Sequence, residues 1–432
     1  MWNLLDKDYN DNKLSNPPLP SCPPPMAPPL PPVLADQDPL IAPRVPLDED
    51  VRRVVAPDGL GLLDGEAPGY EDRWQRQVNT WETVKKKFGL ADNRYCEFEY
   101  LLYLNINDPF VENYINYHLG ICEPLIKCRL RNHLYQWEKL NSPKWLLSTI
   151  KNGVKLPFKS LPPTMVLPNN KTANTAENIP WIRNTLLEFI RYGFVKKVFS
   201  PPKLIMPLQV SIHSSGKKCL IHDESPLNEY IEKSKFKIEG WEEMFNYSAN
   251  ANYGIQFDLK KFYHEIDISE DQQQYFGFMY SMADNEPLTY FVRTVLPYGY
   301  TRAPFLTRHL MKPLISKWRL LNILVVVFVD DGMAVHPNKT FLKKASLQIQ
   351  CDLIRCGLFP GIEKCFWEPT EQLKWVGLRW DFGKNGISVL DRRIENCKAR
   401  ASLLFESWPN VSFRDVSRFV GSISAMQFEA FS

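Results

Sequence analysis

The clearest pattern in the chain is a dense apolar run that ends in two acidic residues. Residues 322–335 read Asn-Ile-Leu-Val-Val-Val-Phe-Val-Asp-Asp-Gly-Met-Ala-Val, and so many Ile, Leu and Val residues in succession are typical of a buried strand. Neighbouring side chains of a strand point to opposite faces, so Asp330 and Asp331 can share one site only at a turn. Because an Asp-Gly pair favours a hairpin turn, we expect Gly332 to supply it.

Other segments predict a mixture of strands and helices. Residues 253–266 form a second strand-like run, with Asp258 near the end of the strand. Residues 180–192 carry an apolar stripe at helical spacing, with Pro180 suited to a first turn and Gly193 to a stop. A further helix is expected from about residue 303, with a kink at Pro313. Short strand-like runs between 195 and 220 complete the pattern, which predicts an α/β (α+β) fold.

The acidic residues suggest a metal site. Two carboxylates about 4 Å apart repel by roughly 4 kcal/mol at an effective dielectric near 20, and a bound divalent cation would remove that cost. Asp258 from one strand and Asp330 and Asp331 from a neighbouring hairpin would form an all-oxygen cluster, which suits two Mg²⁺ ions, with Mn²⁺ as the alternative. Such an ion pair can activate a 3′-hydroxyl and stabilise a leaving pyrophosphate. An ordinary Asp-Gly turn at the surface explains the hairpin equally well without any chemistry.

Five segments, in this order, resemble the motifs of reverse transcriptases. They are Leu-Ile-His-Asp-Glu-Ser-Pro-Leu-Asn (220–228), Phe-Asp-Leu-Lys-Lys-Phe-Tyr-His (257–264), Leu-Pro-Tyr-Gly-Tyr-Thr-Arg-Ala-Pro (296–304), Phe-Val-Asp-Asp (328–331), and Lys364 followed by Leu-Lys-Trp-Val-Gly-Leu (373–378). Each motif is weak alone, whereas five in the family's order are highly specific. The resemblance covers roughly residues 180–432 and is greatest to retroelement enzymes of the DIRS-like and gypsy-like kind.

The resemblance implies a right-hand polymerase with fingers, palm and a partial thumb. Its activity would be that of an RNA-directed DNA polymerase, a nucleotidyltransferase, and its partners an RNA or DNA template with a primer and deoxynucleoside triphosphates. Asp258, Asp330 and Asp331 would be catalytic metal ligands. Lys364 would be the general acid for the departing pyrophosphate, although an ordinary surface lysine is an equal alternative.

The resemblance also assigns residues to the substrates. Tyr263 would pack under the sugar and exclude a 2′-hydroxyl, and Tyr298, Gly299 and Phe328 would lie beside the nucleotide. Lys217 and Lys218 would hold the triphosphate, although a solvated basic turn explains them nearly as well. Here the sequence departs from the family pattern, because Cys219 and Ser225 occupy two positions that are often Arg. The primer grip would comprise Trp375, Val376 and Gly377, although Trp375 could equally be a core residue.

Composition and charge change the picture mainly at the amino terminus. The net charge of the chain is +3, but residues 1–72 hold 5 Lys/Arg and 13 Asp/Glu, a charge of −8, which leaves +11 for the remainder. The basic remainder suits a phosphate-rich ligand. Proline dominates residues 15–46 and favours an extended, disordered tail, which could dock on an SH3 or WW domain.

Cysteine usage and hydropathy bear on location. The nine cysteines are odd in number and contain no Cys-x-x-Cys, which favours a reducing, intracellular compartment, cytoplasmic or nuclear. The longest apolar run, near 323–329, is too short to span a bilayer, so no membrane association is expected.

Four units are expected along the chain. They are a disordered Pro-rich acidic tail (1–72), a helical amino-terminal extension (73–160), the fingers and palm (161–390), and the start of a thumb or connection that is cut short (391–432). Two alternatives stay open. A degenerate or domesticated copy that binds nucleic acid without catalysis would explain Cys219 and Ser225. An RNA-dependent RNA polymerase is disfavoured by Tyr263.

Overall fold

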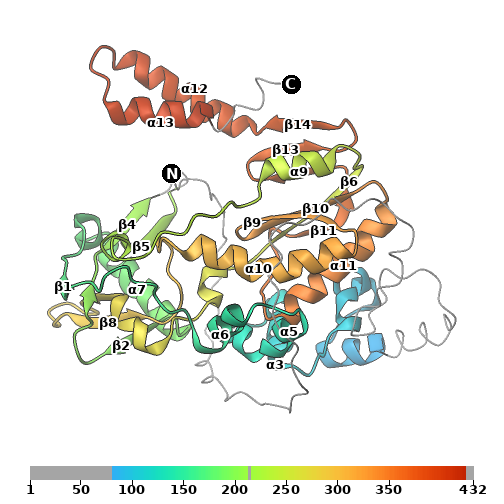
Figure 1. Cartoon of the computed structure of the whole chain (residues 1–432), viewed down its shortest axis with the longest axis horizontal. Coiled ribbons are helices and arrows are strands. Elements are labelled where there is room, and N and C mark those ends of the chain that lie inside the picture. The colour runs from blue at the N-terminus through green and yellow to red at the C-terminus, as the bar shows by residue number, and fades with distance from the viewer. Residues whose placement is uncertain (1–79, 213–215, 425–432) are drawn as a thin grey trace.

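A four-stranded antiparallel sheet lies at the centre of the computed structural model, which describes residues 80–212 and 216–424. This central sheet has the order β11-β6-β10-β9, formed by Phe366–Thr370, Tyr253–Asp258, Asp331–His336 and Leu324–Phe328. The helices α10 (Ala303–Leu320) and α11 (Lys339–Arg355) cover one face of it (Figure 1). The other face packs against α9 (Trp241–Ser248) and a smaller sheet of β12 (Gln372–Trp375), β13 (Leu378–Asp381) and β14 (Gly386–Val389). The strands are apolar on both faces because both faces are covered.

A second, outer sheet has five strands in the order β1-β3-β7-β8-β2. Their bounds are Met165–Val166, Leu204–Ile205, Gly277–Tyr280, Thr289–Arg293 and Val195–Val198. The helix α7 (Asn178–Arg191) packs beside this sheet, and a separate hairpin of β4 (Leu208–Ile212) and β5 (Lys218–His222) adjoins it. The predicted helix near 180–192 is confirmed, and Gly193 at φ +70° ends it in the left-handed conformation that glycine favours.

The helix predicted to begin near residue 303 is α10, and Pro313 lies inside it. Short helices connect the remaining elements: η4 (Lys171–Asn174), α8 (Ser225–Asn228), η5 (Phe262–Glu265) and η6 (Glu270–Tyr275). The predicted α/β (α+β) class is therefore confirmed. The expected disordered tail, residues 1–72, lies outside the described residues.

Residues 80–160, called here the N-terminal extension, are mainly helical. Residues 80–88 form a first helix, followed by η2 (Asp92–Arg94), α2 (Tyr95–Phe98), η3 (Glu99–Tyr103), α3 (Pro109–His118), α4 (Arg129–Asn132), α5 (Leu134–Lys139) and α6 (Lys144–Asn152). Its apolar side chains share one cluster with the buried side of α11. The indole of Trp137 is fully buried and donates to the carbonyl of Cys356, 2.9 Å away. The extension is therefore part of the same folded body as the central sheet.

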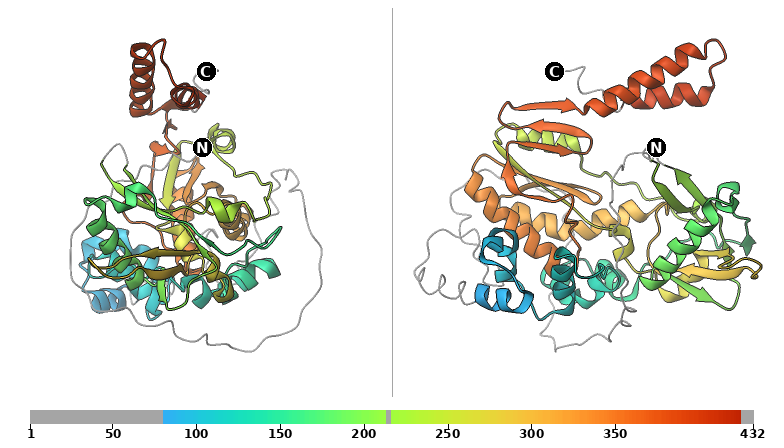
Figure 2. Two further views of the ribbon diagram at one scale, coloured as in Figure 1. Left: turned by 90° about the vertical axis from the view of Figure 1, so that its left-hand side faces the viewer. Right: turned by 180° about the vertical axis from the view of Figure 1, so that it is seen from behind.

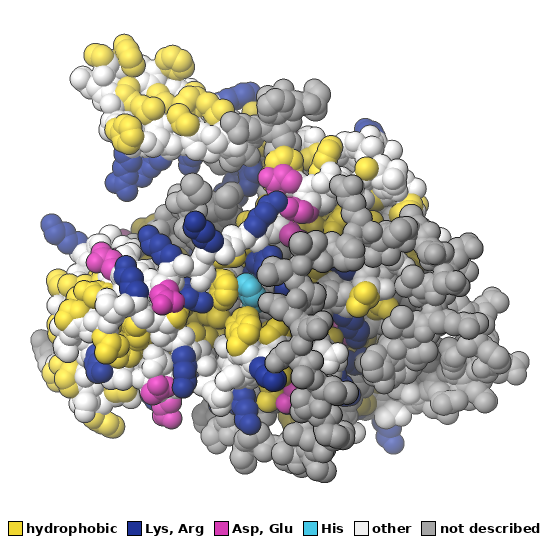
Figure 3. All heavy atoms as spheres, in the orientation of Figure 1, with side chains coloured by type: hydrophobic (Ala, Val, Ile, Leu, Met, Phe, Trp, Pro, Cys, Tyr) yellow, Lys and Arg dark blue, Asp and Glu magenta, His cyan; other side chains and the backbone are white. Residues whose placement is uncertain are grey.

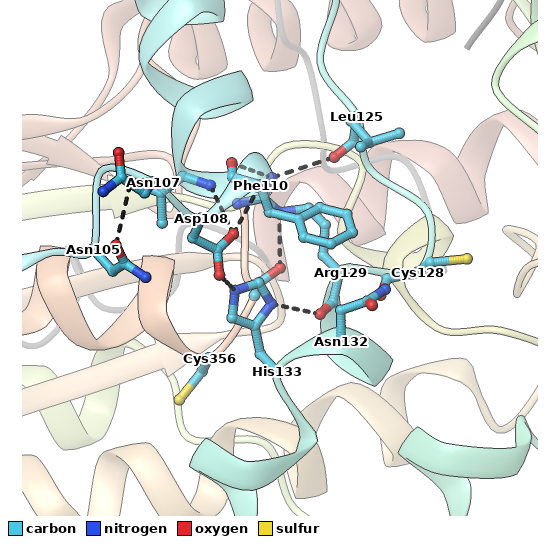
Figure 4. A network of polar contacts seen from close by, with 12 residues as sticks. Asn105, Asn107, Asp108, Phe110, Leu125, Cys128, Arg129, Asn132, His133 and Cys356 are labelled. Atoms are coloured by element: carbon cyan, nitrogen blue, oxygen red, sulfur yellow. Dashed lines mark hydrogen bonds and ion pairs between the residues drawn. The ribbon is translucent and has the colours of Figure 1, made fainter. Parts of the chain in front are cut away.

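A buried guanidinium strengthens this junction (Figure 4). Arg129 is fully buried; its Nε donates to the carbonyl of Gly357 at 3.1 Å and its Nη1 to that of Phe110 at 2.9 Å. Burial lowers the pKa of Arg129 to about 10, and the nearby Glu265 carboxylate partly offsets this. His133 belongs to the same network: its Nδ1 donates to the carbonyl of Arg129 at 2.8 Å, and its Nε2 lies 3.3 Å from Oδ2 of Asp108. Buried charges persist only when they are hydrogen-bonded in this way.

The C-terminal hairpin, α12 (Asp391–Glu406) and α13 (Phe413–Ser424), differs from the rest of the molecule. It projects from the body beyond β14 (Figure 2). Neither helix buries a side chain fully, and several large apolar residues stay exposed, among them Leu403, Phe405, Phe413 and Val420. Within residues 80–212 and 216–424, no helix combines the length and the apolar character that crossing a bilayer requires.

Candidate active site

The register of the central sheet brings the predicted acidic residues to one end of it. Asp331 at the start of β10 lies opposite Asp258 at the end of β6, and on its other side opposite Phe328 of β9. Asp330 belongs to the turn between β9 and β10, and its carbonyl accepts a hydrogen bond from Leu259 N at 2.8 Å. The three carboxylates and Phe328 therefore come from three adjacent strands and the turn that joins two of them.

The expectation that Gly332 makes the turn is wrong. The turn is made at Val329, whose φ is +59°, and at Asp330, whereas Gly332 lies within β10. A Cβ atom at Gly332 would stand only 2.1 Å from Cζ of Phe257 on β6. Gly332 is needed because the ring of Phe257 packs directly against its backbone, a contact between segments far apart in the sequence.

Lys364 lies beside this group of carboxylates. Its Nζ is 4.0 Å from Oδ1 of Asp258, which is only 5% exposed. The turn before β11 that carries Lys364 is tied to the end of β6: Gly361 N donates to the carbonyl of Asp258 at 2.7 Å, and Asp258 N donates to Sγ of Cys365 at 3.3 Å. The structure thus brings Lys364 and Asp258 together.

The oxygen atoms of the three carboxylates are suitable ligands for a hard metal ion, although the side chains do not surround a common point. Asp258 is buried, Asp330 and Asp331 are half-buried, and Asp331 Oδ1 accepts from Nε2 of Gln256 at 3.3 Å. Nowhere in residues 80–212 and 216–424 do three His, Cys, Asp or Glu side chains already converge as a metal cluster. Oxygen donors on adjacent strands suit Mg²⁺ or Mn²⁺, and the side chains would have to turn toward a common ion.

The two tyrosines expected at the nucleotide lie next to each other. Tyr263 in η5 is 5% exposed, and its ring meets that of Tyr298 edge-on at 4.9 Å between centroids. Burial, reinforced by the negative charge of Asp330, raises the pKa of Tyr263 above its usual range. Tyr298 is half exposed, and Gly299 beside it has a φ of +96°. Both tyrosines therefore border the acidic end of the central sheet.

The loop of Tyr298 and Gly299 is held by Asn228, a residue to which the sequence assigned no role. Its Nδ2 donates to the carbonyl of Gly299 and its Oδ1 accepts from Thr301 N, both at 2.8 Å. Under the same loop, the buried Nδ1 of His222 lies 2.8 Å from Oε1 of Glu224. Asn228 closes the 220–228 motif, so its place in the motif was the available signal.

The predicted triphosphate ligands lie on the β4–β5 hairpin, apart from the central sheet (Figure 1). Lys217 is exposed, while Lys218 forms an ion pair with Glu177 at 2.6 Å. Cys219, which stands where the family often has Arg, is exposed. The hairpin therefore presents positive charge at the surface, and Glu177 faces the ammonium of Lys218 there.

Of the predicted primer grip, Trp375 is a core residue. It is fully buried and packs with the apolar cluster between the central sheet and β12–β14. Val376 (φ +48°) and Gly377 (φ +75°) form the turn between β12 and β13. A Cβ atom at Gly377 would meet the guanidinium of Arg393 at 2.0 Å. Only the turn residues are therefore placed to touch a ligand.

A hollow lies between the C-terminal hairpin and the body (Figure 3). Lys and Arg side chains gather on the underside of the hairpin and on the rim opposite it, whereas apolar side chains cover the outer side of the hairpin. A basic hollow of this kind attracts a polyanion.

Comparison with known proteins agrees with the order of the motifs. Residues 206–380 match the profile of the family described as reverse transcriptase (RNA-dependent DNA polymerase). A putative enzymatic polyprotein of cassava vein mosaic virus is 26% identical over 164 residues, which are 36% of this chain and 23% of that protein. A retrovirus-related Pol polyprotein from transposon 297 of Drosophila melanogaster is 21% identical over 185 residues, which are 40% of this chain and 17% of that protein. The matches thus span less than a quarter of either relative.

Two solved structures are similar at 14% identity. The foamy viral protease-reverse transcriptase in complex with dsDNA has a TM-score of 0.46 and is matched over 78% of this chain and 62% of that one. A dRH form, in complex with ds DNA, has a TM-score of 0.45, over 67% and 51%. The family match includes all five motifs completely, among them Asp258, Asp330, Asp331, Lys364 and the primer-grip turn. Residues 206–380 of this chain form a reverse transcriptase domain.

Proposed function

We propose that the chain is the RNA-directed DNA polymerase of a retroelement, which extends a primer with deoxynucleotides by two-metal phosphoryl transfer. The observation that carries the proposal is the pairing of β10 with β6, which sets Asp331 opposite Asp258 with Asp330 in the adjoining turn. The central sheet would be the palm, the outer sheet and the β4–β5 hairpin the fingers, and the C-terminal hairpin the start of the thumb.

In this proposal Asp258, Asp330 and Asp331 hold the metal ions. When bound, two Mg²⁺ ions supply the charge that activates the primer 3′-hydroxyl and stabilises the leaving pyrophosphate. Lys364 holds a proton on Nζ, 4.0 Å from Asp258, and would give it to the pyrophosphate as that group departs. The remaining contribution of the chain is alignment, because phosphoryl transfer needs the attacking and leaving oxygens in line.

The incoming nucleotide would lie against Tyr263, Tyr298, Gly299 and Phe328. Tyr263 is packed edge-on against Tyr298, so its ring cannot move aside freely, and a 2′-hydroxyl would meet it. Lys217 and Lys218 would approach the triphosphate from the fingers. The template and primer would occupy the basic hollow under the C-terminal hairpin, with the turn at Val376 and Gly377 against the primer strand.

Primer extension by the full chain tests this proposal. The assay compares an RNA and a DNA template of the same sequence, with deoxynucleotides or ribonucleotides, in Mg²⁺, in Mn²⁺ and in excess chelator. We expect metal-dependent addition of deoxynucleotides on the RNA template. Addition that survives the chelator, or efficient use of ribonucleotides, would overturn the assignment.

The exposed Cys219, at a position that is often Arg in the family, favours a second candidate: a domesticated copy that binds nucleic acid without catalysis. The same assay separates the two. Template-primer binding with no extension under any of the ion conditions supports the binding protein, and extension above the chelator background excludes it.

A further inference from the structure

A hydrogen-bonded relay connects the N-terminal extension to the turn that carries Lys364. Tyr117 stands near the end of α3, and its hydroxyl donates to Oε1 of Glu363 at 2.8 Å. Nζ of Lys260 donates to the same hydroxyl and lies 3.4 Å from the same carboxylate oxygen. The ammonium also stands 4.7 Å from the centroid of the Tyr117 ring. Two residues from distant segments, Tyr117 and Lys260, thus converge on the carboxylate of Glu363.

The relay is buried at Lys260 and open to water at Glu363, whose side chain is 50% exposed. Lys260 is only 7% exposed, and the ring of Tyr117 packs edge-on against that of Phe359 at 5.3 Å. The carbonyl of Phe359 accepts from Lys260 N at 2.8 Å. Although burial by itself raises it, the pKa of Glu363 is lowered overall, through a backbone hydrogen bond, the charge of Lys260 and the Tyr117 hydroxyl. Hydrogen bonds to an ionised acceptor are among the stronger ones in proteins.

The relay ends at Glu363, the residue beside the candidate proton donor Lys364. Glu363 directly precedes Lys364, whose Nζ is 4.0 Å from Asp258. The turn is tied to Asp258 at both ends, through Gly361 N and Cys365 Sγ, but neither bond holds the side chain of Glu363. The contact of Glu363 with Tyr117 constrains the next residue from outside the central sheet. Since small misplacements of a reacting group are costly in rate, this constraint bears on catalysis.

We propose that Tyr117 of the N-terminal extension is a positioning residue for nucleotide addition, holding Glu363 so that the 361–365 turn keeps Lys364 against Asp258. The inference rests on the proposed function, because it takes Lys364 as the proton donor. It gives the N-terminal extension a role in the rate of the reaction in addition to its packing against α11.

The test is Tyr117→Phe in the full chain, which keeps the ring against Phe359 and removes only the hydroxyl. Single-turnover nucleotide addition is measured with Mg²⁺ at several nucleotide concentrations, so that the maximal rate and the nucleotide Kd are obtained separately. We expect the maximal rate to fall about tenfold, less than the 10²–10⁴-fold supplied by a general acid itself. Nucleotide Kd, template-primer binding and Tm should stay unchanged. Tyr135→Phe, at a half-exposed tyrosine of α5, is the matched control and should leave the rate as it is.

A double-mutant cycle shows whether Tyr117 acts through Lys364. Lys364→Gln should lower the maximal rate by about a hundredfold, and adding Tyr117→Phe to it should lower the rate no further. Effects that multiply, or a Tyr117→Phe rate equal to that of the wild type, overturn the proposal. A fall in Tm that accompanies the fall in the maximal rate of Tyr117→Phe would also overturn the proposal. The role of Tyr117 would then be merely structural.

A measurement that needs no activity distinguishes failure of this inference from failure of the proposed function. Hydrogen exchange at the amides of residues 361–365 is followed in the full chain without nucleotide, for the wild type and Tyr117→Phe. Faster exchange at 361–365 in the variant supports the positioning role even if the chain proves inactive in primer extension. Equal exchange in the two proteins contradicts it, whatever the activity.

Discussion

The acidic end of the central sheet and the β4–β5 hairpin are built in opposite ways. Asp258 ends a strand that has a neighbour on each side and is buried along nearly its whole length. The β4–β5 hairpin is a sheet of only two strands, and Lys217 and Cys219 on it are exposed. The first region would carry the chemistry and the second would hold the triphosphate.

This difference shows which part of the site depends on the core. A one-residue slip of β6 would move every buried side chain of the strand to the wrong face, so the position of Asp258 is set by packing on both faces of the sheet. The β4–β5 hairpin packs on one side only, where Leu208 and Val210 are buried, and a two-stranded hairpin is only marginally stable by itself. Substitutions at its exposed positions, such as Cys219, should therefore cost the fold little, and their effect should fall on nucleotide affinity.

Asp330→Asn should have the largest effect. The change leaves the size of the side chain and the backbone bond to Leu259 in place, but it removes one negative charge from the metal-binding group. We expect single-turnover nucleotide addition to fall at least about a thousandfold, roughly 4 kcal/mol, with template-primer binding largely intact. A variant that retains a tenth of the wild-type rate would show that the carboxylate is not a metal ligand.

Gly332→Ala tests whether the central sheet sets the site by packing. The new Cβ would stand 2.1 Å from the Phe257 ring, and overpacking of this kind typically costs about 1–3 kcal/mol. We expect the midpoint of urea unfolding to fall. The rate of nucleotide addition should fall with it, because Asp331, a proposed metal ligand, directly precedes Gly332. Gly386→Ala, where the nearest atom lies 4.0 Å away, is the matched control. Equal stability of the two variants would contradict the packing argument.

The sequence predicted the elements around the site better than the contacts between them. The strand before Asp258 and the apolar hairpin that carries Asp330 follow from local apolar runs, and so do α7 and α10. The turn was predicted at the wrong residues. Gly332 is required by the packing of Phe257, on another strand, and not by the local preference of Asp-Gly for a turn. Local patterns carry no information about which ring packs on which backbone.

The contacts that the sequence did not predict were missed for the same reason. Tyr117 and Glu363 are 246 residues apart, and Asn228 reaches Gly299 across 71. Only the fold brings such pairs together. Trp375 shows a second limit of the sequence. A tryptophan in a motif can be a ligand contact or a core residue, and only its burial in the structure distinguishes the two.

Tyr263→Ala should change sugar selection more than rate. The ring of Tyr263 is held by Tyr298, and removing it opens room beside Asp330 for one extra oxygen. We expect the ratio of deoxynucleotide to ribonucleotide efficiency on one template to fall at least about tenfold, the equivalent of roughly 1.4 kcal/mol. Tyr263→Phe keeps the ring and should keep the ratio. If the wild type already uses both sugars equally, Tyr263 is not the gate.

Substitutions on the β4–β5 hairpin should have the smallest effect. Lys217→Ala removes an exposed charge, and charged contacts of exposed side chains contribute about 0.2–1 kcal/mol, so the KM for the nucleotide should rise only about two- to fivefold with kcat unchanged. Lys218→Ala should also have a small effect, because Glu177 competes with the triphosphate for that ammonium. Steady-state kinetics at two salt concentrations check both, since a phosphate contact weakens as salt rises. Lys384→Ala, at an exposed turn of the smaller sheet, should change neither constant. A fall in kcat for Lys217→Ala would mean that the hairpin takes part in the chemistry, and the contrast between the two regions would fail.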